Sequence, residues 1–406
     1  MIPVSEALER ILAGVSPTGA ETVALPDAAG RVLAREVAAR LTQPPADVSA
    51  MDGYAVRAAD AAVGARLRVV GASPAGHPFG GGVGAGLVGV GEAVRIFTGG
   101  AVPPGADAIL LQEDAEAGDG VVVPTEAPRA GRWIRRAGLD FFEGDVLLAA
   151  GRRLTARDVG LAAAANHPWL AVHRRPRVAI LATGDEIVLP GEAVPPGGIV
   201  SSNAHALAAL VRASGAEALV LPIAGDDRAA IAGIAGSAAG CDLIVTTGGA
   251  SVGEHDLVQA ALGPEGFSLD FWKIAMRPGK PLIWGRLRHT PLLGLPGNPV
   301  SALVCSVLFL VPALRRLAGL PAGPVPTRAA TLGAALPAND RRQDYLRATL
   351  APGPGGIPVA TAFPTQDSSM LSTLARADAL ILRPPHAPAA EVGFPIEIIE
   401  FAPLGL

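Results

Sequence analysis

Lysine is almost absent from this chain. Of its 33 basic residues only two are lysines, Lys273 and Lys280, and Arg277 lies between them. Lysine is a compact point charge with three donors, whereas arginine is a planar fork, so the two are not interchangeable. The stretch 271–280 ends in the turn Arg-Pro-Gly-Lys-Pro. It is therefore the first candidate site for a phosphate or oxyanion group.

Cysteine, aromatic residues and net charge are also scarce. The two cysteines, Cys241 and Cys305, are far apart and provide neither a disulfide framework nor a Cys-x-x-Cys metal pair, which fits a reducing cytoplasm. Aromatic residues make up 4% of the chain and the formal net charge is −4, so nucleic acid is not expected as a partner. The N-terminus lacks a basic region followed by an apolar run, so no signal peptide is expected.

A long uninterrupted apolar run is missing too. The most apolar stretch, residues 300–314, contains Ser301, Ser306 and Pro312 and is shorter than the ~20 residues needed to span a bilayer. It predicts a buried helix and no membrane span.

Glycine and proline, at 50 and 37 residues, are abundant and indicate many turns and short strands. We expect a multidomain α/β plus β protein. The predicted domains are an N-terminal linking domain (1–56 and 136–175), a β-rich insert (57–135), an α/β domain (176–320) and a C-terminal β-barrel (321–406). Helices are expected at 3–13, where Ser5 can cap, and at 155–165, where Thr155 can cap.

The α/β domain is predicted to be a doubly wound parallel sheet. Continuous apolar strands are expected at 177–182, 218–223, 242–246 and 291–295, alternating with helices at 202–211, 228–238, 257–262 and 300–317. In such sheets ligands bind beyond the carboxyl ends of the strands.

These strand ends carry the unusual residues. In chain order they are Thr183, Gly184 and Glu186; Asp226; Gly248, Gly249, Ser251, Gly253 and Asp256; and Asn298 with Ser301. Glycine turns let a ligand approach the backbone, and consecutive N–H groups bind anions. Asp226, Asp256 and Glu186 could share a Mg²⁺ ion, although Asp226 and Asp256 could also act only as helix N-caps. With the cations of the 271–280 stretch, this set indicates phosphoanhydride chemistry.

Two further loops stand out before the α/β domain. Asp52 precedes Gly53, which can take a positive φ, and Thr98-Gly-Gly100 offers a hydroxyl and free N–H groups beside a Pro-Pro turn. Residues 80–84, four glycines and a valine, lack the helix and the Lys-Ser/Thr of a phosphate loop and predict a flexible hairpin.

A nucleophile elbow is the competing interpretation of the third strand end. Gly249-Ala-Ser251-Val-Gly253 matches Gly-x-Ser-x-Gly after a strand. The following Gly-Glu-His-Asp interrupts the expected helix, and no later Asp and His have a supporting motif, so a serine hydrolase is disfavoured.

Five motifs together resemble a known family. They are Ser49-Ala-Met-Asp-Gly-Tyr-Ala55, Thr183-Gly-Asp-Glu186, Thr246-Thr-Gly-Gly-Ala-Ser-Val-Gly253, Met276-Arg-Pro-Gly-Lys-Pro281 and Leu295-Pro-Gly-Asn-Pro-Val-Ser301. In this order they are similar to molybdopterin molybdenumtransferases, the MoeA-type proteins and the E domain of gephyrin, over essentially the whole chain. The third and fifth motifs are shared with molybdopterin adenylyltransferases and discriminate less.

The resemblance implies a reaction and a set of roles. Molybdenum from molybdate is inserted into adenylylated molybdopterin with a divalent cation, Mg²⁺, and AMP is released by a cytoplasmic homodimer whose site lies between subunits. It implies that Gly248, Gly249, Ser251 and Gly253 hold phosphates in the pterin-binding α/β domain, with Thr183, Gly184, Asn298 and Thr98 among the substrate contacts. Asp226 and Asp256 would serve Mg²⁺ and anhydride cleavage, with Glu186 nearby. Arg277, Lys280, Ser301, Arg347 and Ser368 would meet molybdate, and Asp52 and Thr98 would reach the neighbouring subunit's site.

Two positions depart from the family pattern. Arg277 stands where lysine is frequent, and Asp367-Ser368-Ser369 replaces a Gly-Ser-Gly, which adds a negative charge near a proposed dianion site. Two alternatives remain open at this point, a molybdopterin adenylyltransferase and a non-catalytic scaffold of the same fold. Lys280 is predicted to contact the anion. Lys273 is predicted to have a supporting or phosphate-binding role, because the two lysines lie about 23 Å apart if the chain between them is fully extended.

Overall fold

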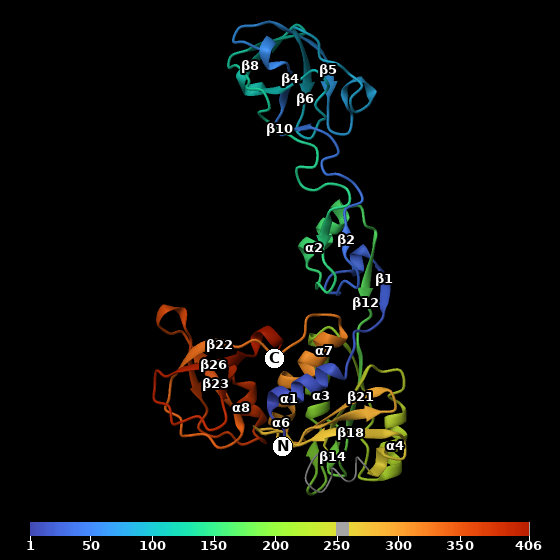
Figure 1. Ribbon diagram of the computed structural model, residues 1–406, viewed down its shortest axis with the longest axis vertical. Helices are drawn as coiled ribbons and strands as arrows, with labels where there is room; N and C mark the ends of the chain where they lie inside the picture. Colours follow the sequence, from blue (N-terminus) through green and yellow to red (C-terminus); the bar gives the residue numbers. More distant parts are fainter. Residues whose placement is uncertain (249–259, 406) are drawn as a thin grey trace.

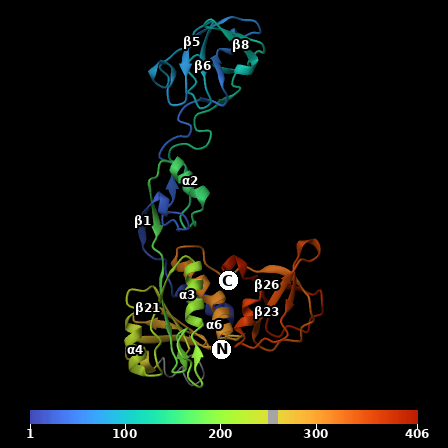
Figure 2. The same ribbon diagram turned by 180° about the vertical axis from the view of Figure 1, so that it is seen from behind.

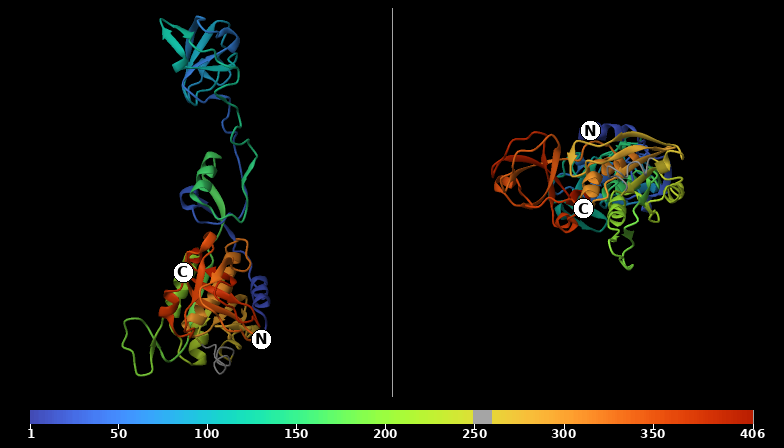
Figure 3. Two further views of the ribbon diagram at one scale, coloured as in Figure 1. Left: turned by 90° about the vertical axis from the view of Figure 1, so that its left-hand side faces the viewer. Right: turned by 90° about the horizontal axis from the view of Figure 1, so that it is seen from below.

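The computed structural model describes residues 1–248 and 260–405. The molecule is elongated: the α/β domain and the C-terminal barrel lie side by side at one end, and the β-rich insert lies at the other (Figure 1). The small linking region separates them, and only two chain segments connect it to the insert (Figure 2). The side view confirms that the insert is remote from the α/β domain (Figure 3).

The α/β domain is built on a six-stranded sheet in the order β16-β13-β17-β21-β20-β18. Its strands are β13 (Arg177–Ala182), β16 (Glu217–Val220), β17 (Leu243–Thr247), β18 (Phe267–Trp272), β20 (Ile283–Leu287) and β21 (Thr290–Leu295). The four predicted strands are present and mutually parallel, as expected. On one side the parallel sheet is extended by two strands that the sequence did not predict, and β20 runs antiparallel to both of its neighbours, β21 and β18. The turn from β20 to β21 contains no glycine that would predict it from the sequence. Arg288 takes the positive φ of this turn, 55°, instead.

Helices cover both faces of this sheet. The helices α1 (Val4–Ala13), α3 (Asn203–Ala213), α6 (Pro299–Cys305) and α7 (Val311–Leu317) share one apolar core, and α4 (Arg228–Gly236) packs in the core of the other face. The N-cap of α1 is Pro3 without a side-chain hydrogen bond, so the predicted capping by Ser5 was wrong. Short strands β14 (Ile187–Val188) and β15 (Ile199–Val200) pair beyond the sheet.

The helix predicted at 300–317 is a buried core helix. α6 and α7 are joined by a π-helical segment, Ser306–Leu310, and 89% of the apolar window in Pro299–Leu317 is buried. Pro312 lacks an N–H, and the Ser306 hydroxyl donates to the Ala302 carbonyl at 2.7 Å, so the wider turn accommodates both.

The linking region and the insert are separate β structures. In the linking region β1 (Ala20–Ala24) pairs with β12 (Trp169–His173) and β2 (Val37–Ala38) with β11 (Val146–Leu148), around α2 (Ala156–Ala164). The Thr155 N–H and hydroxyl both donate to the Asp158 carboxylate at 2.8 Å, so Thr155 begins α2 as predicted.

The insert is a six-stranded sheet in the order β7-β4-β6-β5-β9-β8. Its strands are β4 (Gly53–Val56), β5 (Leu67–Ser73), β6 (Glu92–Ile96), β7 (Ala108–Leu111), β8 (Ala115–Gly118) and β9 (Val121–Pro124), and β3 (Val48–Ser49) pairs with β10 (Ile134–Arg135) at its base. The predicted boundary between residues 56 and 57 falls at the end of β4, a member of this sheet. β5 and β6 are parallel, so the glycine-rich segment 80–84 lies in a crossover and the predicted hairpin was wrong.

The C-terminal barrel contains the five predicted strands. They are β22 (Arg328–Leu332), β23 (Gln343–Ala351), β24 (Val359–Ala362), β25 (Ala379–Arg383) and β26 (Pro395–Glu400), with the short helix α8 (Leu371–Ala375). A sixth strand comes from the α/β domain: β19 (Met276–Arg277) pairs in parallel with β23. The basic turn of the 271–280 stretch is therefore held at the junction of the two domains.

Candidate functional site

Four strand-end turns meet at one edge of the α/β sheet, as the sequence predicted. The Thr183 N–H donates to the Thr247 carbonyl at 3.1 Å, and the Gly184 N–H donates to the Ala224 carbonyl at 3.1 Å. Gly248 has a φ of +91°, and a Cβ on it would lie 2.4 Å from the Thr183 carbonyl oxygen. Only glycine fits there, so Gly248 lets the turns after β13 and β17 pack together.

A cavity of about 550 Å³ opens at this edge. Its lining includes predicted residues, Glu186, Gly248 and Asn298, together with Asn203, Pro281 and Ser369. The hydroxyl of Thr183, 2% exposed, has no hydrogen-bond partner within the described ranges. The cavity is formed by several separate turns, and apolar and polar side chains both line it, as in a ligand site of an α/β sheet.

The acidic residues at the edge have separate tasks. Asp227, not Asp226, is the N-cap of α4, and its carboxylate accepts from the Ala230 N–H at 2.8 Å. The Asp226 side chain is exposed and makes no hydrogen bond or ion pair with the described part of the chain, so the interpretation of Asp226 as a cap was wrong. Asp185, which the sequence analysis did not select, accepts from the Asp226 N–H at 2.9 Å and orients that turn.

Arg277 is engaged by the barrel. Its guanidinium forms an ion pair with Asp344, whose side chain is 5% exposed, and lies 3.8 Å from Asp340. Burial raises the pKa of Asp344, and the Arg277 charge opposes that shift. Both acidic neighbours of Arg277, Asp344 and Asp340, belong to the barrel, so barrel carboxylates offset part of its positive charge.

The loop 365–370 of the barrel reaches the sheet edge. The Asn298 amide donates to the Ser368 hydroxyl at 3.0 Å, and the Val300 N–H donates to the Ser368 carbonyl at 3.1 Å. Ser368 therefore lies beside the start of α6, where Ser301 is buried.

Arg347 supports this loop from below. It is 1% exposed, and its guanidinium donates to the carbonyls of Met370 and Asp367 at 3.1 and 3.0 Å. In this geometry Arg347 does not face the cavity, so the predicted direct contact with molybdate does not fit; Arg347 instead fixes the loop that carries Ser368.

Lys273 and Lys280 are brought close by a reversal of the chain. The Ile274 N–H donates to the Lys280 carbonyl at 2.9 Å, so the fully extended spacing expected from the sequence was wrong. The Lys273 Nζ lies 3.6 Å from the centroid of the Trp272 ring, a cation–π geometry. Lys280 is exposed and has no ion pair with any residue of the described ranges, which leaves its charge available to an anion.

Asp52 and Thr98 belong to the insert. The insert lies at the opposite end of the molecule from the sheet of the α/β domain (Figure 1). The Asp52 carboxylate accepts from the Thr98 N–H at 2.7 Å and from its hydroxyl at 2.8 Å. Gly53 does not take a positive φ, contrary to expectation. A Cβ there would lie 2.0 Å from the Leu110 carbonyl oxygen, so close strand packing requires the glycine.

The Thr98 bonds hold the pKa of Asp52 below its ordinary value, the backbone bond first and the hydroxyl bond second. Thr98→Val removes only the hydroxyl. We expect the Asp52 pKa to rise while remaining below the ordinary value, because the backbone donor stays. Carboxyl ¹³C NMR titration measures it. A lowered folded-state pKa stabilises the fold above the unfolded-state pKa, and this contribution is lost as pH falls through the folded-state value. If the Asp52 pKa is unchanged in Thr98→Val, the Thr98 hydroxyl does not contribute to lowering it.

Four predicted residues, Gly249, Ser251, Gly253 and Asp256, lie outside the described residues, as do the proposed nucleophile elbow and the first half of the helix predicted at 257–262; residues 260–262 are helical, as predicted.

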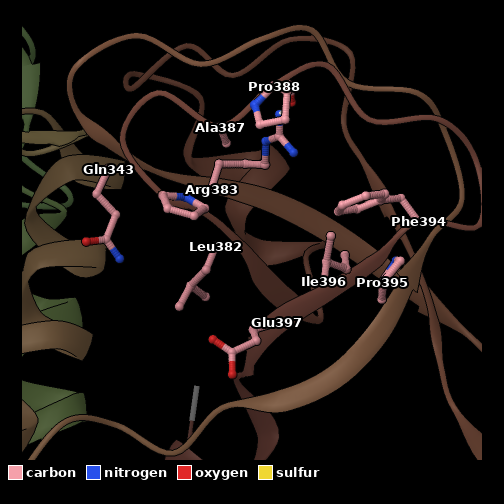
Figure 4. Close-up of a pocket in the computed structure, with 10 residues that line it drawn as sticks. Gln343, Leu382, Arg383, Ala387, Pro388, Phe394, Pro395, Ile396 and Glu397 are labelled. Carbon is pink, nitrogen blue, oxygen red and sulfur yellow. The ribbon is translucent and has the colours of Figure 1, made fainter.

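A second cavity has none of the described predicted site residues in its lining. It has a volume of about 540 Å³ and sits in the C-terminal barrel, where Phe394, Leu382 and Ile396 line it with Arg383 and Glu397 (Figure 4). Arg383 is buried and donates to the carbonyls of Pro337 and Pro388, so it supports the wall of the cavity.

The strand-end cavity and the neighbouring basic turn define the class: an α/β protein with a ligand site at the carboxyl ends of its parallel strands. Three family models match the chain: "MoeA N-terminal region (domain I and II)" at residues 2–166, "Probable molybdopterin binding domain" at 179–316 and "MoeA C-terminal region (domain IV)" at 329–401.

Whole proteins match as well. A molybdopterin molybdenumtransferase of Nostoc sp. is 36% identical over 90% of this chain and 85% of its own length, and one of Bacillus subtilis is 32% identical over 98% and 94%. The crystal structure of a molybdopterin biosynthesis MoeA protein from Pyrococcus horikosii superposes with a TM-score of 0.86 at 30% identity, covering 99% of both chains. The chain belongs to the MoeA family of molybdopterin molybdenumtransferases, which are transferases of molybdenum cofactor biosynthesis.

Proposed function

We propose that this protein inserts molybdenum from molybdate into adenylylated molybdopterin, cleaves the anhydride with the help of Mg²⁺ and releases AMP. The observation that carries the proposal is the cavity at the sheet edge. The turns after β13, β17 and β21 line it together with the barrel loop that contains Ser369, and Lys280 lies one residue from Pro281 of its lining.

The phosphates of the substrate bind at the strand-end turns. Gly248 brings its backbone close to the ligand, and Gly249, Ser251 and Gly253, predicted from the sequence to hold phosphates, follow it in the chain. Thr183, Gly184 and Asn298 complete the contacts on the neighbouring turns. The barrel loop that Arg347 fixes adds Ser369 to the cavity wall.

The acidic residues suit Mg²⁺ bound largely by the substrate. Among the described residues no group of three or more His, Cys, Asp or Glu side chains forms a metal cluster. Mg²⁺ takes one or two carboxylates together with waters and phosphate oxygens, which fits the exposed Asp226 with the predicted Asp256. The bound ion would neutralise charge on the anhydride, while Glu186 lies at the cavity wall.

Molybdate is seated at the junction with the barrel. Lys280 supplies an available positive charge, Ser301 and Ser368 lie at the start of α6, and Arg277 adds a charge that Asp344 partly offsets. Lys273 supports this loop. An oxygen of molybdate, or of a water beside it, attacks a phosphorus of the anhydride, the bridging phosphorus–oxygen bond breaks, and AMP leaves. The dithiolene sulfurs replace oxygen on molybdenum; the displaced oxygen leaves within AMP or as water, and the thiol protons are released.

The site is completed by a second copy in a cytoplasmic homodimer. The insert, which carries Asp52 and Thr98, lies far from the α/β domain within one chain (Figure 3). An elongated dimer can bring the insert of one copy to the α/β domain of the other, because a two-fold axis places the same pair of surfaces together twice.

AMP release should require molybdate. Purified protein with adenylylated molybdopterin and Mg²⁺ is expected to release AMP only after molybdate is added, and chromatography of the nucleotide measures it. Release without molybdate would contradict the coupling. Formation of adenylylated molybdopterin from ATP and molybdopterin would instead identify an adenylyltransferase. If the protein shows neither activity, the non-catalytic scaffold is favoured.

A further inference from the structure

Asn203, the first residue of α3, connects three elements of the site. Its amide nitrogen donates to the Thr247 hydroxyl at 2.8 Å, at the end of β17. The same nitrogen donates to the Gly297 carbonyl at 2.6 Å, in the turn after β21. One side chain thus joins α3 to two neighbouring strand ends, and it also lines the cavity.

The orientation of this amide is fixed by its partners. If the amide were flipped, its oxygen would face the Gly297 carbonyl oxygen, and two acceptors would oppose each other. The orientation with nitrogen toward Gly297 is therefore the only one that makes both hydrogen bonds.

The two connected turns touch each other. A Cβ on Gly297 would lie 3.5 Å from the Gly248 Cα, which places the turns after β17 and β21 in van der Waals contact. The Thr247 hydroxyl, 3.5 Å from the Pro296 carbonyl, lies beneath the same contact. The spacing of Gly248, Gly297 and Asn298 depends on this small set of contacts.

The oxygen of the Asn203 amide, unlike the nitrogen, makes no hydrogen bond with the described residues. This oxygen is also buried. An unsatisfied buried acceptor costs free energy, about 1–3 kcal/mol, so a residue chosen only for stability would avoid it. The helix begins without a side-chain cap on Ser202 as well, which leaves polar groups at the cavity wall.

We propose that Asn203 is a positioning residue for the reaction: its amide sets the Gly297-Asn298 turn against Gly248, and its unpaired oxygen accepts a hydrogen bond from the bound pterin substrate or a water it orders. This inference rests on the proposed function and adds a residue to it.

Asn203→Asp tests the amide. At neutral pH a carboxylate oxygen would replace the donor 2.6 Å from the Gly297 carbonyl and repel it. We expect KM for adenylylated molybdopterin to rise about tenfold. As pH falls, the introduced carboxyl gains a proton and donates again, so the activity of the variant relative to wild type should recover. A purely structural role would give no such recovery.

Asn166→Asp is the matched control. Asn166 follows α2 in the linking region, has a φ of 67°, and its side chain makes no hydrogen bond within the described ranges. The same chemical change there should leave KM and the pH profile as in wild type. Asn203→Ala removes the amide without adding charge and covers the case in which the carboxylate variant does not fold.

A crystal structure of a folded Asn203 variant separates this inference from the proposed function. We expect the Gly297-Asn298 turn to shift from Gly248 whatever reaction the protein performs. An unmoved turn, or an unchanged KM in an active enzyme, would overturn the positioning role. Failure of wild type to release AMP, with a displaced turn in the variant, would overturn the proposed reaction and leave the structural role of Asn203 in place.

Discussion

Lys280→Gln is expected to reduce AMP release by about 10²- to 10³-fold, the range found when one charge-stabilising donor is removed from an active site. Lys280 is exposed, has no ion pair with any residue in the described ranges, and adjoins Pro281 of the site cavity. Its positive charge is thus available to an anionic substrate, and glutamine retains most of its length without that charge. Single-turnover AMP release at saturating molybdate measures the effect.

Lys273→Gln is the control from the same loop. The Lys273 ammonium lies over the Trp272 ring, so its loss should alter local packing more than catalysis, with a rate within about tenfold of wild type. Lys280→Arg should restore only part of the rate, because the guanidinium is a planar fork and not a compact charge. Equal losses in the two glutamine variants would contradict the separate roles of the two lysines.

Mixing two inactive variants should restore activity. If Asp52 of one copy serves the site of the other, Asp52→Ala and Lys280→Gln damage different contributions to each site. After random subunit exchange about half of the dimers are mixed and each mixed dimer has one complete site, so about one quarter of wild-type activity is expected. AMP release before and after mixing measures the recovery.

Asp226→Asn with Lys280→Gln is the matching control pair. Both residues belong to the α/β domain of the same chain, so a mixed dimer contains no complete site and activity should stay low. Recovery in both mixtures, or in neither, would contradict a site shared between two copies. Light scattering establishes that each variant is a dimer.

Local pattern was sufficient for the central sheet. Continuous apolar runs such as 177–182 and 291–295 gave the parallel strands, because a strand buried on both faces has no polar alternation. Parallel strands necessarily end at one edge, so the meeting of the Thr183, Gly184 and Gly248 turns followed from the sequence. The antiparallel strand β20, between β21 and β18, was missed because Arg288 provides the turn geometry without glycine.

The sequence by itself determined the family, through five motifs in order, and the chemistry of the strand-end residues. Only the tertiary structure decided which partners those residues have. Arg277 meets Asp344 through a pairing between two domains, Arg347 turns to the loop beneath Ser368, and Asn203 joins strand ends that are 44 and 94 residues away. Contacts over such separations depend on how the elements pack, and no local periodicity encodes them. The same reason placed Asp52 far from the sheet edge, so that the proposed site needs a second copy of the chain.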